Sequence, residues 1–112
     1  MKTEKEIVYP AGVSAEKVAQ WKAENKNGIA RIETKYEGKE YSAYIRRPTR
    51  EDMRELSAKG GTVDPVTYTE IVLGQLWLGG DEEIRDVDAV FFGVMEVVQG
   101  VLDVQKAQLK KL

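Results

Sequence analysis

Apolar and polar residues alternate along residues 29–47, and this two-residue period is typical of β-strands. One face of the pattern carries Ala30, Ile32, Thr34, Tyr36, Tyr41, Ala43 and Ile45. Glu37-Gly38 separates the two runs, and glycine supplies the positive φ that a tight hairpin turn requires. Because a lone two-stranded ribbon is marginal in water, we expect this hairpin to pack on helices or to gain a third strand.

A short polar helix is predicted before the hairpin. Ser14 can accept a hydrogen bond from an orphan amide at the helix start, and Asn25-Lys26-Asn27-Gly28 suits a left-handed end. Val18 and Trp21 share one face of this helix. Since an isolated helix of this length is marginal, much of its stability must come from docking.

Two further helices are predicted in the middle of the chain. Thr49 caps the first, with Asp52 three residues later as a variant of the capping box, and Gly60-Gly61 ends it. Asp64-Pro65 opens the second, because aspartate caps well and proline is tolerated at the first helical position. Gly79-Gly80 closes this second helix, which is the more apolar of the two.

The last predicted helix is the longest, and Asp86 or Asp88 can cap its start. Apolar residues recur at three- and four-residue steps through Val87, Val90, Phe91, Val94, Val98, Val101 and Leu102. Gly93 and Gly100 lie one heptad apart on similar sides, and a close helix crossing would explain both. Lysines 106, 110 and 111 lie near its end, where positive charge complements the helix dipole.

These elements predict an α+β fold: a β-hairpin packed against about four helices, of which the C-terminal helix is the longest. A third edge strand, making a three-stranded sheet, is the alternative, and within the N-terminal tail only residues 7–9 are apolar enough to dock as a short edge strand. The 112 residues fit one domain with its own core. We assign residues 1–13 to a flexible N-terminal tail and residues 14–112 to a single α+β domain.

Histidine and cysteine are both absent from the sequence. Their absence removes the usual side chain for proton transfer near neutral pH, the thiolate nucleophile and the commonest zinc ligands. The serines therefore have no partner for a Ser-His-Asp triad, and the paired glycines lack the rest of a phosphate-loop motif. We expect no enzymatic activity, no cofactor and no bound metal.

The charge and hydropathy of the chain restrict its partners. A net charge of −2 and a pI of about 5.3 do not favour broad attraction to nucleic acid or to anionic membranes. The most apolar run, residues 87–104, is interrupted by acidic and amide side chains, and the first ten residues lack the apolar stretch of a signal peptide. We expect no membrane contact and a cytoplasmic location, which the lack of cysteine permits.

A cluster of carboxylates precedes the last helix and consists of Asp81, Glu82, Glu83, Asp86 and Asp88. Calcium binds clustered oxygens, but the spacing lacks the central glycine and distal glutamate of an EF-hand loop. The spacing also does not specify the separation of a glycosidase acid–base pair. We interpret these carboxylates as negative charges that complement the dipole at a helix N-terminus.

Four arginines form the one basic cluster of the sequence: Arg46, Arg47, Arg50 and Arg54. With Tyr36, Tyr41 and Tyr44 nearby, the cluster resembles a stacking surface for single-stranded nucleic acid, although the consensus of an RNA-recognition motif is absent. Two other interpretations stay open. The arginines can pair with the acidic excess, or they can form a hot spot in a protein interface.

The run YSAYIRRPTREDMRELSA, followed by DPVTYTEIVLGQLWLGGDEEI, resembles small tail assembly chaperone-type proteins of tailed phages and prophages. The shared pattern is a strand, R-x-P-[TS], a helix, a D-P helix with aromatic or apolar residues, a short acidic turn and a final helix. The matching positions are Arg46, Pro48, Thr49, Asp64, Pro65, Trp77, Leu78, Gly79, Gly80 and Asp81. The resemblance spans residues 28–110, and it rests on the order of motifs that are individually ordinary helix punctuation.

The resemblance implies a non-enzymatic role in the cytoplasm of a bacterial host. Proteins of this kind bind the tape-measure protein, keep its long apolar helices from aggregating and help to recruit tail-tube subunits. A tape-measure-like or tail-tube-like protein is therefore the expected partner, and self-association into a homo-oligomer is also plausible. Two alternatives remain: a small nucleic-acid-binding module, and a structural tail or head-completion component that stays in the particle.

We predict that a partner binds the exposed apolar and basic surface formed by Arg46, Arg47, Trp77, Leu78 and Phe92. Phe91 and Phe92 are adjacent, so both cannot lie centrally on one helix face, and Phe92 or Leu78 is expected to be exposed. Trp77 also fits a place in the core, because apolar aromatic residues at helical spacing usually pack there. A groove between helices would suit an amphipathic partner helix.

Overall fold

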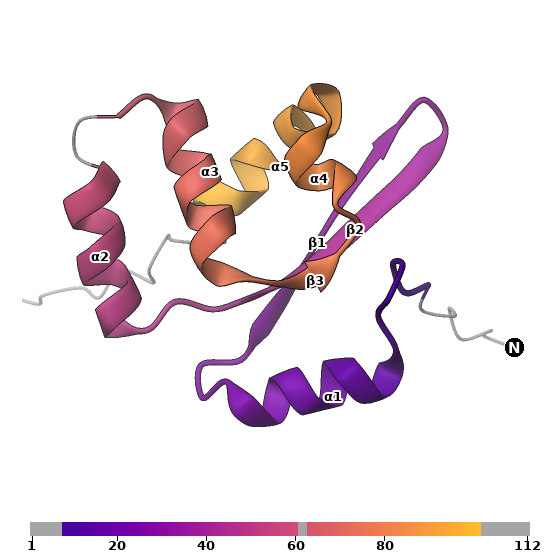
Figure 1. Cartoon of the computed structure of the whole chain (residues 1–112), viewed down its shortest axis with the longest axis horizontal. Coiled ribbons are helices and arrows are strands. Elements are labelled where there is room, and N and C mark those ends of the chain that lie inside the picture. Colours follow the sequence, from indigo (N-terminus) through magenta and orange to yellow (C-terminus); the bar gives the residue numbers. More distant parts are fainter. Residues whose placement is uncertain (1–7, 61–62, 102–112) are drawn as a thin grey trace, which may run out of the picture.

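The computed structural model describes residues 8–60 and 63–101 and has the α+β architecture that the sequence predicts. One antiparallel sheet in the order β1-β2-β3 contains β1 (Ile29–Tyr36), β2 (Lys39–Arg46) and β3 (Trp77–Gly80). The helices in these residues are α1 (Ala15–Glu24), α2 (Arg50–Gly60), α3 (Pro65–Leu76), α4 (Glu83–Asp86) and α5 (Asp88–Val101). The hairpin is therefore extended by a third strand and packed with helices (Figure 1).

The β1–β2 hairpin has the register that the alternation predicts. Ile32 lies opposite Ala43 and Ala30 lies opposite Ile45, so these apolar side chains share one face of the sheet. Glu37 and Gly38 form the turn with φ angles of 51° and 80°. Positive φ at both central turn positions matches the right-handed twist of the flanking strands, and glycine adopts it without steric cost.

The third strand does not come from the residues that we expected. The helix predicted to continue to Gly79-Gly80 ends at Leu76. The backbone becomes extended at Trp77, and the following residues pair with β2. Gly80 lies directly opposite Ala43 at a φ of 141°. An added Cβ at Gly80 would lie 2.4 Å from the Ala43 Cα, so only glycine permits this close approach. Residues 8 and 9 lie outside any strand, and residue 7 lies outside the described residues.

Side-chain caps start the predicted helices at the expected residues. Ser14 accepts a hydrogen bond from the Lys17 amide at the start of α1, and Asp64 accepts one from the Thr67 amide at the start of α3. Thr49 and Asp52 form a reciprocal capping box before α2, with each side chain accepting from the amide of the other residue. The cap positions predicted for these three helices are therefore confirmed. The cap predicted for the last helix is wrong, because α5 begins at Asp88 directly after Val87, so neither Asp86 nor Asp88 occupies the cap position.

A short helix, α4, precedes the predicted last helix and lies where the sequence was interpreted as an acidic turn. Val87 has extended dihedrals (φ −105°, ψ 118°), so the short α4 ends before it and α5 begins after it. The break separates buried Ile84 from the buried stripe of α5, and both still reach the same core. In the described residues α5 ends at Val101, so the predicted continuation through residue 102 and the three lysines lies outside them.

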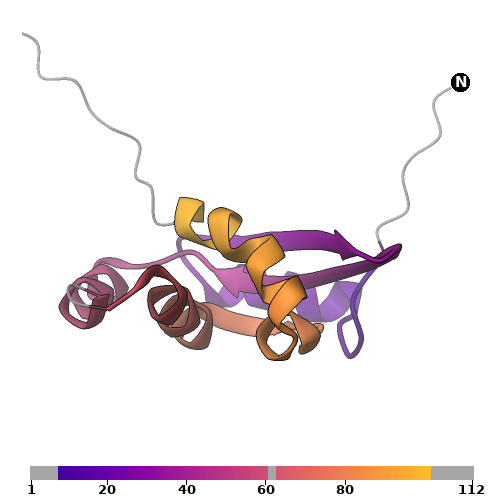
Figure 2. The same cartoon turned by 90° about the horizontal axis from the view of Figure 1, so that it is seen from above.

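The main core lies between one face of the sheet and the helices α3, α4 and α5, and α2 contributes Leu56 to it. Its buried members are Ile32, Ala43, Ile45, Leu56, Val72, Leu73, Leu76, Ile84, Val90, Phe91, Val94 and Val98. Figures 1 and 2 show these three helices on one side of the strands and α1 on the other. Burial of these side chains supplies the main favourable term in folding.

A single tryptophan fixes α1 to the opposite face of the sheet. Trp21 is 8% exposed, and its ring centroid lies 5.8 Å from that of Tyr44. The Trp21 ring also covers Gly79, where an added Cβ would lie 2.9 Å from the Cη2 atom. This polar helix is therefore held by an aromatic contact with β2 and β3.

The two glycines of α5 have different surroundings. An added Cβ at Gly93 would lie 2.5 Å from Thr34 Oγ1, so α5 approaches strand β1 closely there. An added Cβ at Gly100 would meet nothing within 4 Å. The close approach is between a helix and a strand, whereas the glycine spacing had suggested a crossing of two helices.

We expect Gly80→Ala to destabilise the fold by about 2–3 kcal/mol, because an L-residue at this φ is strained and its Cβ would strike the β2 backbone. Gly74→Ala is the matched control. Position 74 is an exposed site in α3 with open space around the added Cβ, so it should gain up to about 1 kcal/mol. Urea denaturation of both variants measures the difference, and equal stabilities would contradict the close packing of β3 on β2.

Candidate functional site

Arg46, the first of the predicted partner-binding residues, is held in an internal network at the end of β2. Its guanidinium donates two hydrogen bonds to the Asp52 carboxylate, forming a bidentate ion pair between β2 and α2. Arg46 also donates to the carbonyl oxygen of Gln75 at 3.2 Å. This side chain therefore joins β2, α2 and α3, and its donors point inward.

Asp52 is the acceptor at the centre of this network, and it is 5% exposed. Besides the Arg46 pair, its carboxylate accepts from the Thr49 amide at 2.8 Å and from Gln75 Nε2 at 2.9 Å. The hydrogen bond from Arg46 is the largest cause that holds the pKa of Asp52 far below its usual range, and it outweighs the opposing effect of burial. The same bond raises the pKa of Arg46.

Arg47 lies just beyond β2, and its side chain is exposed. Its backbone N–H donates to the Gly28 carbonyl at 3.0 Å and continues the hairpin ladder by one residue. Arg47 therefore presents its charge to solvent from a fixed backbone position.

Trp77 and Leu78 lie side by side in β3, and both are half-buried. Trp77 is opposite Ile45 in the sheet, and one part of its ring packs on the core. The Arg85 guanidinium stacks over the ring, 4.1 Å from the centroid. The sequence left open whether Trp77 lies in the core or is accessible to a partner. In the structure it is partly in the core and partly accessible.

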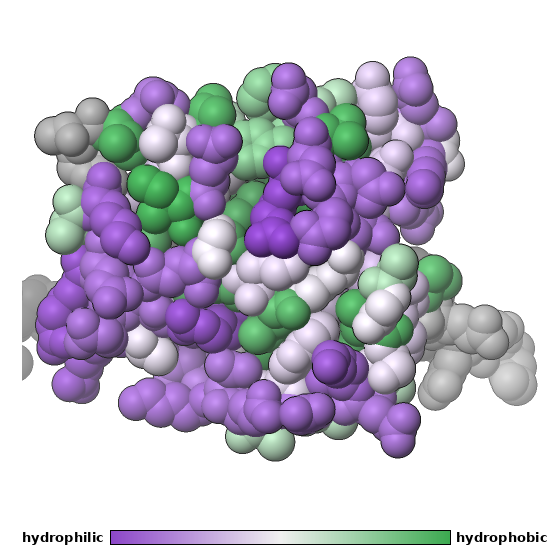
Figure 3. Space-filling model, in the orientation of Figure 1, coloured by the Kyte–Doolittle hydropathy of each residue, from purple (hydrophilic) through white to green (hydrophobic). Residues whose placement is uncertain are grey.

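Phe92 lies on the exposed side of α5, while Phe91 beside it is buried in the core. The two rings make an edge-to-face contact with centroids 5.9 Å apart. Phe92 keeps 55% of its surface accessible, so the sequence correctly predicted that one of the two is exposed. On the face in Figure 3, hydrophobic residues form small separate groups among hydrophilic ones.

The five predicted residues do not form one patch. Arg46, Arg47, Trp77 and Leu78 lie on β2 and β3 or just beyond β2, while Phe92 lies on α5, which packs over β1. The tyrosines proposed for nucleic-acid stacking are also divided between the two faces of the sheet. Tyr41 packs on the helix side, whereas Tyr44 is buried against Trp21 on the other side.

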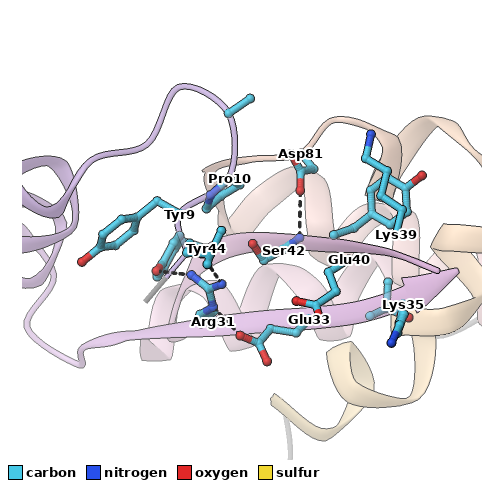
Figure 4. Close-up of a pocket in the computed structure, with 14 residues that line it drawn as sticks. Tyr9, Pro10, Arg31, Glu33, Lys35, Lys39, Glu40, Ser42, Tyr44 and Asp81 are labelled. Carbon is cyan, nitrogen blue, oxygen red and sulfur yellow. Dashed lines mark hydrogen bonds and ion pairs between the residues drawn. The ribbon is translucent and has the colours of Figure 1, made fainter. Parts of the chain in front are cut away.

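The sequence did not single out an open groove of about 780 Å³ that lies on the sheet face opposite the helix layer (Figure 4). It lies over β1 and β2 and is bordered by residues 8–11. Arg31 spans it, donating to Glu33 at 2.5 Å, to the Tyr44 hydroxyl at 2.6 Å and to the Val8 carbonyl at 2.7 Å. Burial opposes the charge on Arg31, but the bonds to Glu33 and Tyr44 prevail and raise its pKa.

The groove carries charges of both signs. Lys35 and Lys39 provide positive charge, and Glu33, Glu40 and Asp81 provide negative charge. Asp81 is already engaged, because its carboxylate accepts from the Ser42 amide and its own amide donates to the Ser42 carbonyl. The sequence signal for this surface is the second face of the β1 alternation, which reads Arg-x-Glu-x-Lys.

The acidic turn before α4 does not assemble into a metal site. Glu82 pairs with Arg85 at 2.6 Å, and Asp81 is held by β2. Within residues 8–60 and 63–101, no group of three or more acidic side chains is placed to hold a metal ion.

Comparison of the chain with protein-family models, with curated proteins and with solved structures gives no match. None of the described helices combines the length and the apolar character needed to cross a membrane.

We expect Asp52→Asn to destabilise the protein by about 2–3 kcal/mol at neutral pH, because Arg46 loses its charged partner in a mostly buried site. The folded-state pKa of Asp52 lies below the unfolded value of about 3.9, so its contribution is complete above that value and is lost as the pH falls below it. The difference between wild type and variant should therefore shrink in acid.

Chemical denaturation between about pH 7 and pH 2 measures this difference, with Glu51→Gln as the control. Glu51 pairs with Arg54 at 2.8 Å, but both side chains are exposed, so its loss should cost less than about 0.5 kcal/mol. A pH-independent difference for Asp52→Asn would show that its carboxylate charge does not stabilise the fold.

Proposed function

We propose that this protein is a non-enzymatic assembly chaperone that holds an apolar helical segment of a tape-measure-like protein, as the family resemblance implies. The observation that carries the proposal is the exposed aromatic ring of Phe92 on the outer side of α5. Burying such a side chain against a partner is worth about 1.5–3 kcal/mol. Aromatic residues of this kind are common anchors at protein interfaces.

The surroundings of Phe92 define the partner more closely. Asp88 and Glu96 lie four residues before and after it, so they flank the ring on the same side of the helix, and both are exposed. This surface suits an amphipathic helix whose apolar stripe is bordered by lysine or arginine.

We expect Phe92→Lys to weaken binding of such a helical segment at least about tenfold, because it removes the apolar anchor and places a cation against the basic border of the partner. Tyr36→Lys is the matched control, since Tyr36 is a similarly accessible aromatic residue at the end of β1. The protein is co-expressed with a tape-measure-like helical fragment, and the amount of fragment in the soluble fraction is measured. Titration of the purified fragment then measures the strength of binding.

Other outcomes would contradict the proposal. A fragment that stays insoluble beside the wild-type protein, or equal losses for the two variants, would remove Phe92 as the anchor. Binding of single-stranded oligonucleotides that weakens with salt and is lost in Arg47→Ala would instead support a nucleic-acid-binding module. Recovery of the protein in purified particles would support a structural component.

A further inference from the structure

Strand β1 forms one border of the sheet. The contacts of neighbouring residues show which of its backbone groups bond to β2 and which point outward. The Arg47 amide donates to the Gly28 carbonyl, and this pair continues the register in which Ile29 lies opposite Arg46. Bonded and non-bonded pairs alternate along an antiparallel ladder, so the even-numbered residues of β1 bond to β2. The backbone N–H and C=O groups of Ile29, Arg31, Glu33 and Lys35 therefore point away from the sheet.

The hydrogen bonds on the other edge of β2 lead to the same assignment of the β1 backbone groups. Ser42 lies opposite Glu33, and its amide and carbonyl point toward the β3 side, where Asp81, directly after β3, bonds to both. In the described part of the chain, no hydrogen bond outside helices and strands involves the backbone N–H or C=O groups of residues 29, 31, 33 and 35. Such a row is a ready template for another strand.

The side chains on this border are charged in alternation: Arg31, Glu33 and Lys35 lie on the face away from the helix layer. A strand with charges of a single sign would meet a like charge at one of these positions. A strand that places a negative charge opposite Arg31 and a positive charge opposite Glu33 would fit both. The β1 sequence meets this requirement when it runs antiparallel to itself.

We propose that β1 pairs antiparallel with β1 of a second copy of this chain, in the register that places Ile32 opposite Ile32. This register sets Arg31 against Glu33 of the second copy, and the symmetry repeats the contact. A shift of two residues in either direction places Arg31 opposite Arg31 or Glu33 opposite Glu33. The charges therefore favour this register over the two neighbouring registers that the outward-pointing backbone groups also allow.

The helix layer offers a second contact beside this border. Gly93 places α5 over Thr34 of β1, and Figure 2 shows α5 crossing the hairpin obliquely. Val97 and Gly100 follow on the same side of α5; Val97 is 49% exposed, and the space around Gly100 is open. A sheet continued through two copies brings these two surfaces together. Their apolar contact adds to a strand pairing that alone is smaller than stable dimer interfaces.

Sedimentation equilibrium of the full chain over a range of concentrations tests the pairing. We expect a species of twice the 12.6 kDa chain mass to form reversibly. Glu33→Arg should raise the dimer dissociation constant about tenfold or more, because two attractive cross-strand pairs become repulsive. Arg31→Glu should do the same, and an equimolar mixture of the two variants should dimerise again, because each arginine then faces a glutamate.

Amide exchange followed by NMR gives a readout that is specific to the backbone. The amides of Arg31, Glu33 and Lys35 should exchange slowly only at concentrations where the dimer forms, whereas those of Ile32 and Thr34 are protected by β2 throughout. Lys35→Pro removes one outward donor that the β1–β2 ladder does not use, so it should weaken the dimer while the monomer stays folded. Lys35→Ala is the matched control that keeps the amide.

A chain that is monomeric at every accessible concentration would overturn the proposal. A dimer unaffected by Glu33→Arg and by Lys35→Pro would also overturn it, because the contact would then lie elsewhere. Protection of the β1 amides only after a tape-measure-like segment is added would assign the border to that partner. Sedimentation and amide exchange of the protein alone succeed or fail independently of binding by Phe92.

Discussion

The burial of β2 on both faces is the constraint on which the rest of the structure depends. Four consecutive residues of this strand, 42–45, are buried, because helices cover one face while α1 and residues 8–11 lie against the other. Such a strand needs partners on both edges and cover on both faces. The chain meets this need by folding the segment after α3 back as β3 and by placing Trp21 over Tyr44.

The local part of this arrangement could be predicted from the sequence. The hairpin register follows from a two-residue period, and the helix starts follow from caps that act within three residues, as at Ser14 and Thr49. The end of α3 could not be predicted in this way, because Trp77 and Leu78 continue its apolar pattern. Their strand conformation is set by pairing with β2, which lies more than thirty residues earlier in the chain.

The same distinction applies to the candidate site. The exposure of Phe92 follows from its adjacency to Phe91, since neighbouring residues on a helix cannot share one face. The inward engagement of Arg46 depends on Gln75, which is 29 residues away, and on the way α2 packs against α3. A basic cluster in the sequence thus contains both a structural arginine and, in Arg47, an exposed one, and only tertiary contacts separate them.

The two borders of the sheet are unequal, and this inequality limits how the molecule can associate. The β3 border has four residues and a sharp register shift beside it, whereas the β1 border has eight residues in continuous register. Short and irregular edges resist pairing with other chains, and long regular edges invite it. Phe92 projects from the outer side of α5, and the β1 groups point along the sheet. The proposed pairing of two copies and the proposed binding of a helical partner would therefore use different surfaces, and the two proposals are compatible with one assembly.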